Sequence, residues 1–214
     1  MKILKDLPKT IPIFPLSNFI ILPKTTVPLN IFEPRYIQMI DDSMKSHRMI
    51  GMVQPRKNLD NEKTEVYKIG CMGKITSFNE TEDGRYLIIL NGISRFHILE
   101  ELKNEKLYRS CNVDFSFYKN DLSDDKIKKE DINLGKIFKD LKSLFKKQGY
   151  VINWKDLEKQ SVDQTINTLA MASPFSLEEK QILLETLTLN NRKEKLEEIL
   201  KTYIFDEFSN TTLQ

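Results

Sequence analysis

The spacing of hydrophobic residues changes once along the chain, near Phe117. Before that point they alternate with polar residues or form short β-branched runs between turn-forming residues, as buried and half-buried strands do. After it they recur every three or four residues, as on one face of an amphipathic helix. Two periods in two separate halves predict a β unit followed by a helical unit.

The first half contains several candidate strands, which cover residues 10–14, 27–32, 49–53, 67–78, 86–99 and 108–117. Asp83-Gly84 predicts a tight hairpin turn, because glycine readily adopts a positive φ. Gly73 and Gly92 lie inside strand patterns, where a β-bulge or a barrel bend is expected. We therefore expect the strands to curl into a closed or nearly closed sheet.

Helices are expected at one place in the first half and throughout the second. Pro34 suits a first helical turn, and the apolar residues after it predict a helix over residues 34–46. Apolar residues from 134 to 145 repeat at helical spacing before Gly149, a typical C-terminal cap, and a last amphipathic helix spans 196–204. Two capping-box patterns mark further helix starts: Ser161 with Gln164, and Ser176 with Glu179.

These elements predict an α+β chain, with a β-barrel that contains one early helix and is followed by a C-terminal helical bundle. The expected bounds are 1–118 for the barrel, 119–131 for a charged linker and 132–208 for the helical subdomain.

Composition limits the classes of function. The 214 residues are 40% hydrophobic and 30% charged, with a formal net charge of +2. The chain therefore lacks the strongly basic composition that is typical of nucleic-acid-binding domains. Cys71 and Cys111 have no metal-site spacing, and no early apolar run resembles a secretion signal or a membrane span. We expect a cytoplasmic protein that does not enter membranes.

The sequence lacks the common catalytic signatures. It has no phosphate loop that ends in Gly-Lys-Ser/Thr and no Gly-x-Ser-x-Gly elbow. A cysteine nucleophile paired with His97 is a weak alternative, since nothing local supports it. Adjacent acidic pairs do not face one another on a helix or strand, and the lysines of residues 136–147 suit a solvated helix face. We expect no catalytic residues, no metal and no cofactor.

Several motifs occur in order along the chain, at residues 11–23, 27–36, 69–75, 83–86, 90–96 and 177–185, with Arg192 after them. Together they resemble the Lon N-terminal (substrate-binding) domain, particularly its stand-alone bacterial form. The resemblance covers about residues 10–201 and implies a PUA-like β pseudo-barrel followed by a helical subdomain.

The resemblance also implies a function. In Lon proteases this region precedes an ATPase module and a Ser-Lys protease module, and these 214 residues contain neither. It therefore implies a non-enzymatic protein-binding module in protein quality control. The expected partners are unfolded or extended protein segments, with a protease or chaperone as a further partner. RNA binding is the alternative, by analogy with other PUA-like barrels. The oligomeric state is not predicted.

Phe19, Ile20, Ile21 and Leu22 are the candidate substrate-binding residues. They lie between Pro15 and Pro23, in a segment poorly suited to a central strand. An exposed apolar patch for extended chain and a cap on the barrel core are equally compatible with this run, because periodicity does not separate them.

The remaining motif residues are interpreted as structural. Phe32 and Tyr36 are expected in the core rather than at a contact surface. Gly73 and Gly92 are expected to be required by the backbone conformation rather than by a ligand. An ion pair between Glu33 and either Arg35 or Arg95 is the favoured interpretation, and it would hold the start of the early helix against the barrel. The alternative is a clamp for a ligand carboxylate made by Arg95.

Overall fold

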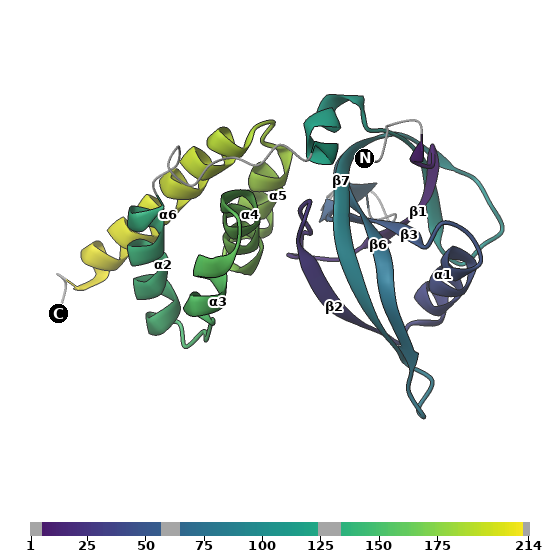
Figure 1. The fold of residues 1–214 in the computed structure, drawn as a ribbon, viewed down its shortest axis with the longest axis horizontal. Helices are drawn as coiled ribbons and strands as arrows, with labels where there is room; N and C mark the ends of the chain where they lie inside the picture. Colours follow the sequence, from purple (N-terminus) through teal and green to yellow (C-terminus); the bar gives the residue numbers. More distant parts are fainter. Residues whose placement is uncertain (1–5, 57–64, 124–133, 212–214) are drawn as a thin grey trace. The chain divides into compact units, whose positions relative to one another are not determined.

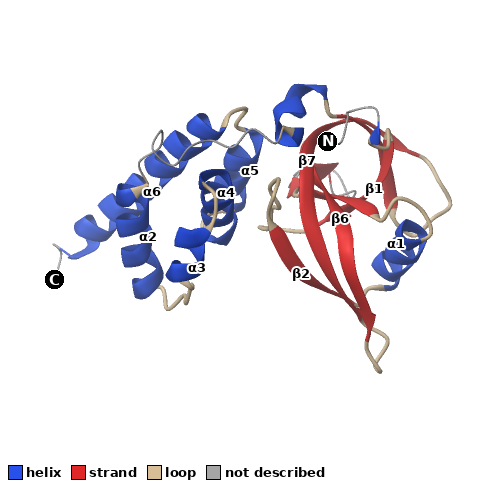
Figure 2. Ribbon diagram, in the orientation of Figure 1, coloured by secondary structure: helices blue, strands red, loops and turns tan. Residues whose placement is uncertain are grey.

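The computed structural model describes residues 6–56, 65–123 and 134–211, and side chains up to residue 204. The chain divides into two compact units, Met1–Asp124 and Asp125–Gln214. The first unit carries the strands and the second carries helices (Figure 1, Figure 2). The α+β class predicted from the sequence is confirmed.

The first unit is built around a six-stranded sheet. Its strands are β1 (Thr10–Pro15), β2 (Thr26–Ile31), β3 (Met49–Val53), β6 (Ile69–Glu80), β7 (Tyr86–Leu102) and β8 (Arg109–Asp114). A small separate pair consists of β4 (Pro55–Arg56) and β5 (Glu65–Val66), and the early helix is α1 (Pro34–Met44). The predicted strands and the predicted early helix are all present, with shifts of a few residues at their ends.

Strand β7 closes the sheet into a barrel. The sheet order is β2-β7-β6-β3-β1-β8, and β7 also pairs with β8. Residues Tyr86–Asn91 of β7 pair with β2, whereas residues His97–Leu102 pair with β8. The closed ring therefore contains β1, β3, β6, β7 and β8, and β2 lies outside it as an edge strand (Figure 1).

The barrel encloses an apolar core. Its buried members are Leu7, Ile11, Ile13, Val53, Met72, Phe96, Ile98, Cys111, Val113 and Phe115. The Phe96 side chain is fully buried, and its ring meets the Phe115 ring edge-on with 6.2 Å between centroids. Cys71 and Cys111 are buried and form no disulfide, and they pack as small apolar residues do.

The bulge expected at Gly73 and Gly92 is confirmed. Met72 pairs with Ser94 but Gly73 pairs with Gly92, so Ile93 is the extra residue. A Cβ atom on Gly92 would lie 2.1 Å from the carbonyl oxygen of Leu22. The turn before β2 therefore packs on the bulge at a distance that only glycine allows.

The second unit consists of α2 (Gly135–Lys147), α3 (Trp154–Lys159), α4 (Val162–Ala172), α5 (Leu177–Glu185) and α6 (Leu189–Thr211). The Ser176 capping box is present: the Glu179 amide donates to Ser176 Oγ at 3.2 Å, and the Ser176 amide donates to Glu179 Oε2 at 2.8 Å. Gly149 follows α2 with a φ of 73°, as expected of a cap. The short helix α3 was not predicted.

The segment after β8 differs from the prediction. The expected strand to residue 117 ends at Asp114, and a 3₁₀ helix, η2 (Ser116–Leu122), follows it. Residues 119–122, expected in a linker, belong to this helix. The Asp121 carboxylate in this segment accepts hydrogen bonds from Arg95 of β7, which holds the helix on the barrel. The rest of the expected linker, residues 124–131, lies outside the described residues.

We predict that Gly92→Ala destabilises the barrel, because the new Cβ meets the Leu22 backbone rather than a movable side chain. The expected loss is about 1–3 kcal/mol of unfolding free energy, typical of overpacking. Gly84→Asn is the control, since Gly84 has a φ of 77° and nothing within 4 Å of a Cβ, and asparagine tolerates that conformation. Urea denaturation measures both, and an equal loss in the two variants would contradict the prediction.

Candidate functional site

The apolar run before β2 is mostly buried. Ile20 is 2% exposed and Ile21 and Leu22 are 0% exposed, whereas Phe19 is partly exposed. The hydroxyl of Thr25 donates to the Leu22 carbonyl at 2.6 Å and fixes the turn that presses this run onto Gly92. The exposed-patch alternative is therefore wrong for Ile20, Ile21 and Leu22, because their side chains complete the core.

Glu33 forms the expected ion pair, but only locally. It is the N-cap residue of α1, and its Oε2 accepts from Arg35 Nε at 2.9 Å. Both side chains are about half exposed, at 45% for Glu33 and 54% for Arg35. The expectation that this pair holds the start of α1 against the barrel is wrong, because both residues belong to the same helical turn.

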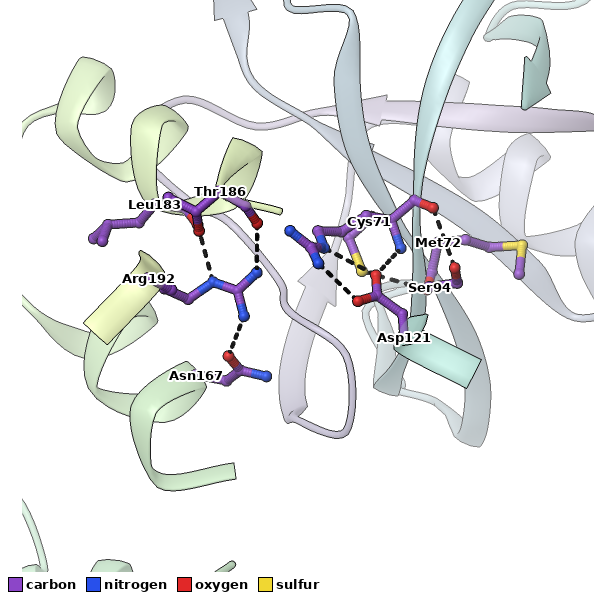
Figure 3. Close-up of polar contacts among 9 residues, drawn as sticks. Cys71, Met72, Ser94, Asp121, Asn167, Leu183, Thr186 and Arg192 are labelled. Carbon is purple, nitrogen blue, oxygen red and sulfur yellow. Dashed lines mark hydrogen bonds and ion pairs between the residues drawn. The ribbon is translucent and has the colours of Figure 1, made fainter. Parts of the chain in front are cut away.

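Arg95 pairs with a residue that the sequence did not indicate. Its Nε donates to Asp121 Oδ2 at 2.9 Å and its Nη2 to Asp121 Oδ1 at 2.8 Å (Figure 3). The Arg95 backbone amide also donates to Asp121 Oδ2 at 2.9 Å, and the Tyr118 ring covers the guanidinium at 4.1 Å. The side chains of Arg95 and Asp121 are 3% and 9% exposed. This geometry favours a structural role, which fixes η2 on β7, over a clamp for a ligand.

A second buried arginine joins helices of the second unit. Arg192 Nε donates to the Leu183 carbonyl at 3.0 Å, and its Nη1 donates to Asn167 Oδ1 at 2.8 Å (Figure 3). Its Nη2 reaches the Thr186 carbonyl at the C-terminal end of α5. The guanidinium therefore satisfies carbonyls that a helix end leaves without intrahelical partners.

The first unit carries a cleft beside the start of α1, which we call the α1 cleft. It has a volume of about 260 Å³. Its lining residues are Ile13, Pro15, Ser17, Arg35, Tyr36, Pro55, Leu107, Tyr108 and Arg109. Apolar and aromatic groups dominate this lining, which includes no histidine, cysteine or carboxylate among the residues that the structure describes.

Aromatic stacking organises one wall of the α1 cleft. The buried Tyr36 ring packs on Phe14 with 4.3 Å between centroids, and the Arg35 guanidinium lies 4.6 Å from the Tyr36 centroid. Burial raises the pKa of the Tyr36 hydroxyl above its ordinary value of 10.0, so Tyr36 itself is uncharged at neutral pH. Tyr36, expected only in the core, therefore also lines a surface cleft. The same expectation is wrong for Phe32, whose side chain is 65% exposed.

The loop between β7 and β8 forms the opposite wall, and α1 holds it in place. The Tyr108 hydroxyl and Lys106 Nζ both donate to Asp42 Oδ2, at 2.8 and 2.9 Å. The Leu107 amide donates to Gln38 Oε1 at 2.9 Å, while 63% of the Leu107 side chain stays exposed. Hydrogen bonds from Lys106 and Tyr108 lower the pKa of Asp42 below its ordinary value.

Sequence reasoning did not predict the α1 cleft: it named Arg35 and Tyr36 only as structural residues and did not single out Leu107, Tyr108 or Arg109. Leu107, Tyr108 and Arg109 lie outside the motifs that carry the family resemblance, and they reach α1 only through the fold. Arg109 pairs with Glu101 through both carboxylate oxygens, at 3.0 and 2.7 Å. One available signal was Leu107 itself, an apolar residue in an otherwise charged turn.

Two classes of site are absent from the part of the chain that the structure describes. No group of three or more His, Cys, Asp or Glu side chains there is arranged to hold a metal ion. Within the same residues, no helix combines the length and the apolar character needed to cross a membrane.

Comparison with known sequences points to one family. The model of the ATP-dependent protease La (LON) substrate-binding domain matches residues 10–202. Lon protease of Flavobacterium johnsoniae is 28% identical in an alignment 207 residues long, which covers 92% of this chain and 24% of the relative. Lon protease 2 of Myxococcus xanthus is 24% identical over 198 residues, with the same two coverages. The chain thus spans about a quarter of the length of these relatives.

Solved structures show the same fold. The N-terminal domain of the Mycobacterium avium complex Lon protease superposes with a TM-score of 0.63 at 17% identity, over 90% of this chain and 98% of that one. The Lon N-terminal domain protein from Xanthomonas campestris gives a TM-score of 0.59 at 22% identity, over 90% and 97%.

We predict that Asp121→Ala costs about 3–5 kcal/mol of unfolding free energy, because it leaves the buried Arg95 charge without its partner. Glu33→Ala is the matched control: it also removes the carboxylate of an arginine pair, but an exposed one, and should cost less than about 1 kcal/mol. Chemical denaturation of both variants tests this, and similar costs would show that burial of the Arg95 pair has no energetic consequence.

We also predict that the β7–β8 loop loosens in acid. A lowered pKa means that the charged form of Asp42 is favoured while the loop is docked. Docking is therefore stabilised above the ordinary pKa of 3.8 and weakens as the pH falls through the lowered value. The amide resonance of Leu107, followed by NMR from neutral to acid pH, should report this titration. The titration should vanish in Asp42→Asn, and its persistence there would contradict the assignment.

Proposed function

Because the chain belongs to the Lon substrate-binding domain family, we propose that it binds unfolded or extended segments of other proteins and anchors one of their side chains in the α1 cleft. The proposal includes no catalytic step. It places the protein in cytoplasmic quality control, with a protease or chaperone acting on the bound segment. The two free, buried thiols suit such a reducing compartment.

The lining of the α1 cleft is the observation that carries this proposal. Its volume of about 260 Å³ is below the roughly 300–1,000 Å³ of typical small-molecule sites, so it suits one side chain of a longer segment. Tyrosine and arginine, both enriched in protein interfaces, supply two residues each to the lining. The exposed Leu107 at the rim gives an incoming side chain further apolar contact.

The absence of reactive groups in the α1 cleft supports binding without cleavage. Ser17 is the one hydroxyl-bearing lining residue other than the tyrosines, and no histidine or carboxylate lines the cleft to activate it. His97, in β7, meets the Phe117 ring at 6.2 Å and is not among the lining residues.

We predict that Leu107→Ser weakens binding of reduced, alkylated lactalbumin by about 1–2 kcal/mol, because it removes an apolar contact at the rim. Leu99→Ser is the matched control, since Leu99 is 59% exposed, close to the 63% of Leu107, and does not line the cleft. Fluorescence anisotropy measures both affinities, and thermal unfolding checks that both variants fold.

The salt dependence of the same assay separates protein binding from RNA binding. An apolar anchor keeps its affinity at moderate salt, whereas contacts to phosphates weaken steeply. Equal affinities of the Leu107 and Leu99 variants would overturn the assignment to the α1 cleft. Binding of a structured RNA, with a steep loss in salt and no binding of the unfolded protein, would overturn the proposed function.

A further inference from the structure

Strand β2 has one open side. It pairs with residues 86–91 of β7, and no other strand in the described part of the chain pairs with it. In an antiparallel pair, alternate residues direct both backbone groups toward the partner. The Gly92 amide donates to the Thr25 carbonyl at 2.8 Å, which sets this alternation. Residues 25, 27, 29 and 31 therefore face β7, and the backbone groups of Thr26, Pro28 and Asn30 point to the open side.

A second hydrogen bond gives the same alternation. The Thr81 amide donates to the Arg85 carbonyl at 2.9 Å across the β6–β7 turn. Hydrogen-bonded pairs recur at every second residue of an antiparallel ladder. Counting from Thr81 and Arg85, the next hydrogen-bonded pairs are Asn79 with Leu87 and Ser77 with Ile89. Leu87 and Ile89 thus face β6 with their backbone groups, which leaves the intervening residues of β7 to face β2.

The open edge lacks the usual charge protection. Natural edge strands are commonly protected by charged residues, by proline or by a covering element. The sequence of β2, Thr-Val-Pro-Leu-Asn-Ile, has no charge, and its one protective residue is Pro28. Because proline lacks an N–H, the open side presents the amides of Thr26 and Asn30 and three carbonyls. The side chains of these three residues are exposed.

We propose that β2 is a second binding surface, which accepts an extended segment of another protein as an added strand and recognises its main chain. Ile89, 38% exposed, lies beside Pro28 on the outer face, and Phe32, 65% exposed, follows the strand. Uncharged residues thus neighbour the added strand, which selects a segment of small polar and apolar residues. The partner class is that of the proposed function, but the surface and the chemistry differ, so each can fail alone.

A second copy of this chain fits the edge less well than a foreign segment. Two-fold pairing of β2 with itself about Pro28 sets Pro28 opposite Pro28 and Thr26 opposite Asn30. Both central residues then lack the N–H that the facing carbonyl needs. A segment without proline loses one hydrogen bond at this position instead of two.

The test uses a short fluorescein-labelled peptide of alternating threonine and valine. On binding, the amides of Thr26 and Asn30 should gain protection from hydrogen exchange, whereas those of Val27 and Leu29 are protected already. A fully N-methylated peptide with the same side chains should not bind as an added strand, because it has no backbone N–H donors. Failure of the peptide to bind, or binding without new protection at Thr26 and Asn30, would overturn the proposal.

Two variants with a matched control sharpen the test. Asn30→Pro removes one outward amide and should weaken peptide affinity about 3- to 10-fold relative to Asn30→Thr, which keeps the amide. Pro28→Thr adds an amide and should strengthen it by a similar factor. Thermal unfolding confirms that each variant folds. Equal affinities of the Asn30 variants would show that the β2 main chain does not take part.

The outcomes also separate this inference from the proposed function. Leu107→Ser should leave the protection of Thr26 and Asn30 unchanged; loss of that protection would assign the peptide to the α1 cleft and overturn the β2 proposal. Protection without peptide that rises with protein concentration would identify a second copy as the occupant. Protection independent of concentration would identify a segment of the same chain. Either result would overturn the proposal.

Discussion

The pairing of one long strand with three others determines the architecture of the first unit. Strand β7 holds β6 along one side and, on its other side, β2 followed by β8. Because β8 takes the second half of that side, the ring closes with five strands and β2 cannot join it. The same closure that removes the edges of the other strands leaves β2 with an open one. The bulge at Ile93 lies between the two halves of β7, where the pairing passes from β2 to β8.

The outer face of β7 also fixes where the first unit ends. Arg95 lies three residues after Gly92 and carries its charge outside the apolar barrel core, where η2 covers it. A buried guanidinium needs a partner, and Asp121 meets its Nε, its Nη2 and the Arg95 backbone amide. Residues 119–122 therefore belong to the barrel, although their composition is typical of a linker.

The sequence predicted what local spacing determines and missed what tertiary pairing determines. Strands, the Asp83-Gly84 turn, the bulge glycines and both capping boxes depend on neighbouring residues, and all of them are present. The burial of Ile20 to Leu22 was undecided because an apolar run has the same pattern in a core and on a surface. The Arg95–Asp121 pair spans 26 residues and the Leu107 contact with Gln38 spans 69, so no local motif reveals them. Such contacts bring Leu107 and Tyr108 to α1, which is why the sequence did not predict the α1 cleft.

In the binding mode that we propose, the α1 cleft and the β2 edge would recognise different features of an extended partner. An unfolded partner has no fixed surface, so a binding module reads either single side chains or the repeating main chain. The α1 cleft has room for a side chain, and each net hydrogen bond at the edge contributes only about 0.5–1.5 kcal/mol. On this proposal, each surface alone would bind weakly, which would suit a module that releases the segments it binds. Pro28 would limit this binding without preventing it. A charged residue at this position would disfavour the addition of a strand, whereas an uncharged residue with an N–H would complete the row of outward amides and favour edge-to-edge aggregation. A proline removes one hydrogen bond from every possible partner and keeps the rest of the edge open.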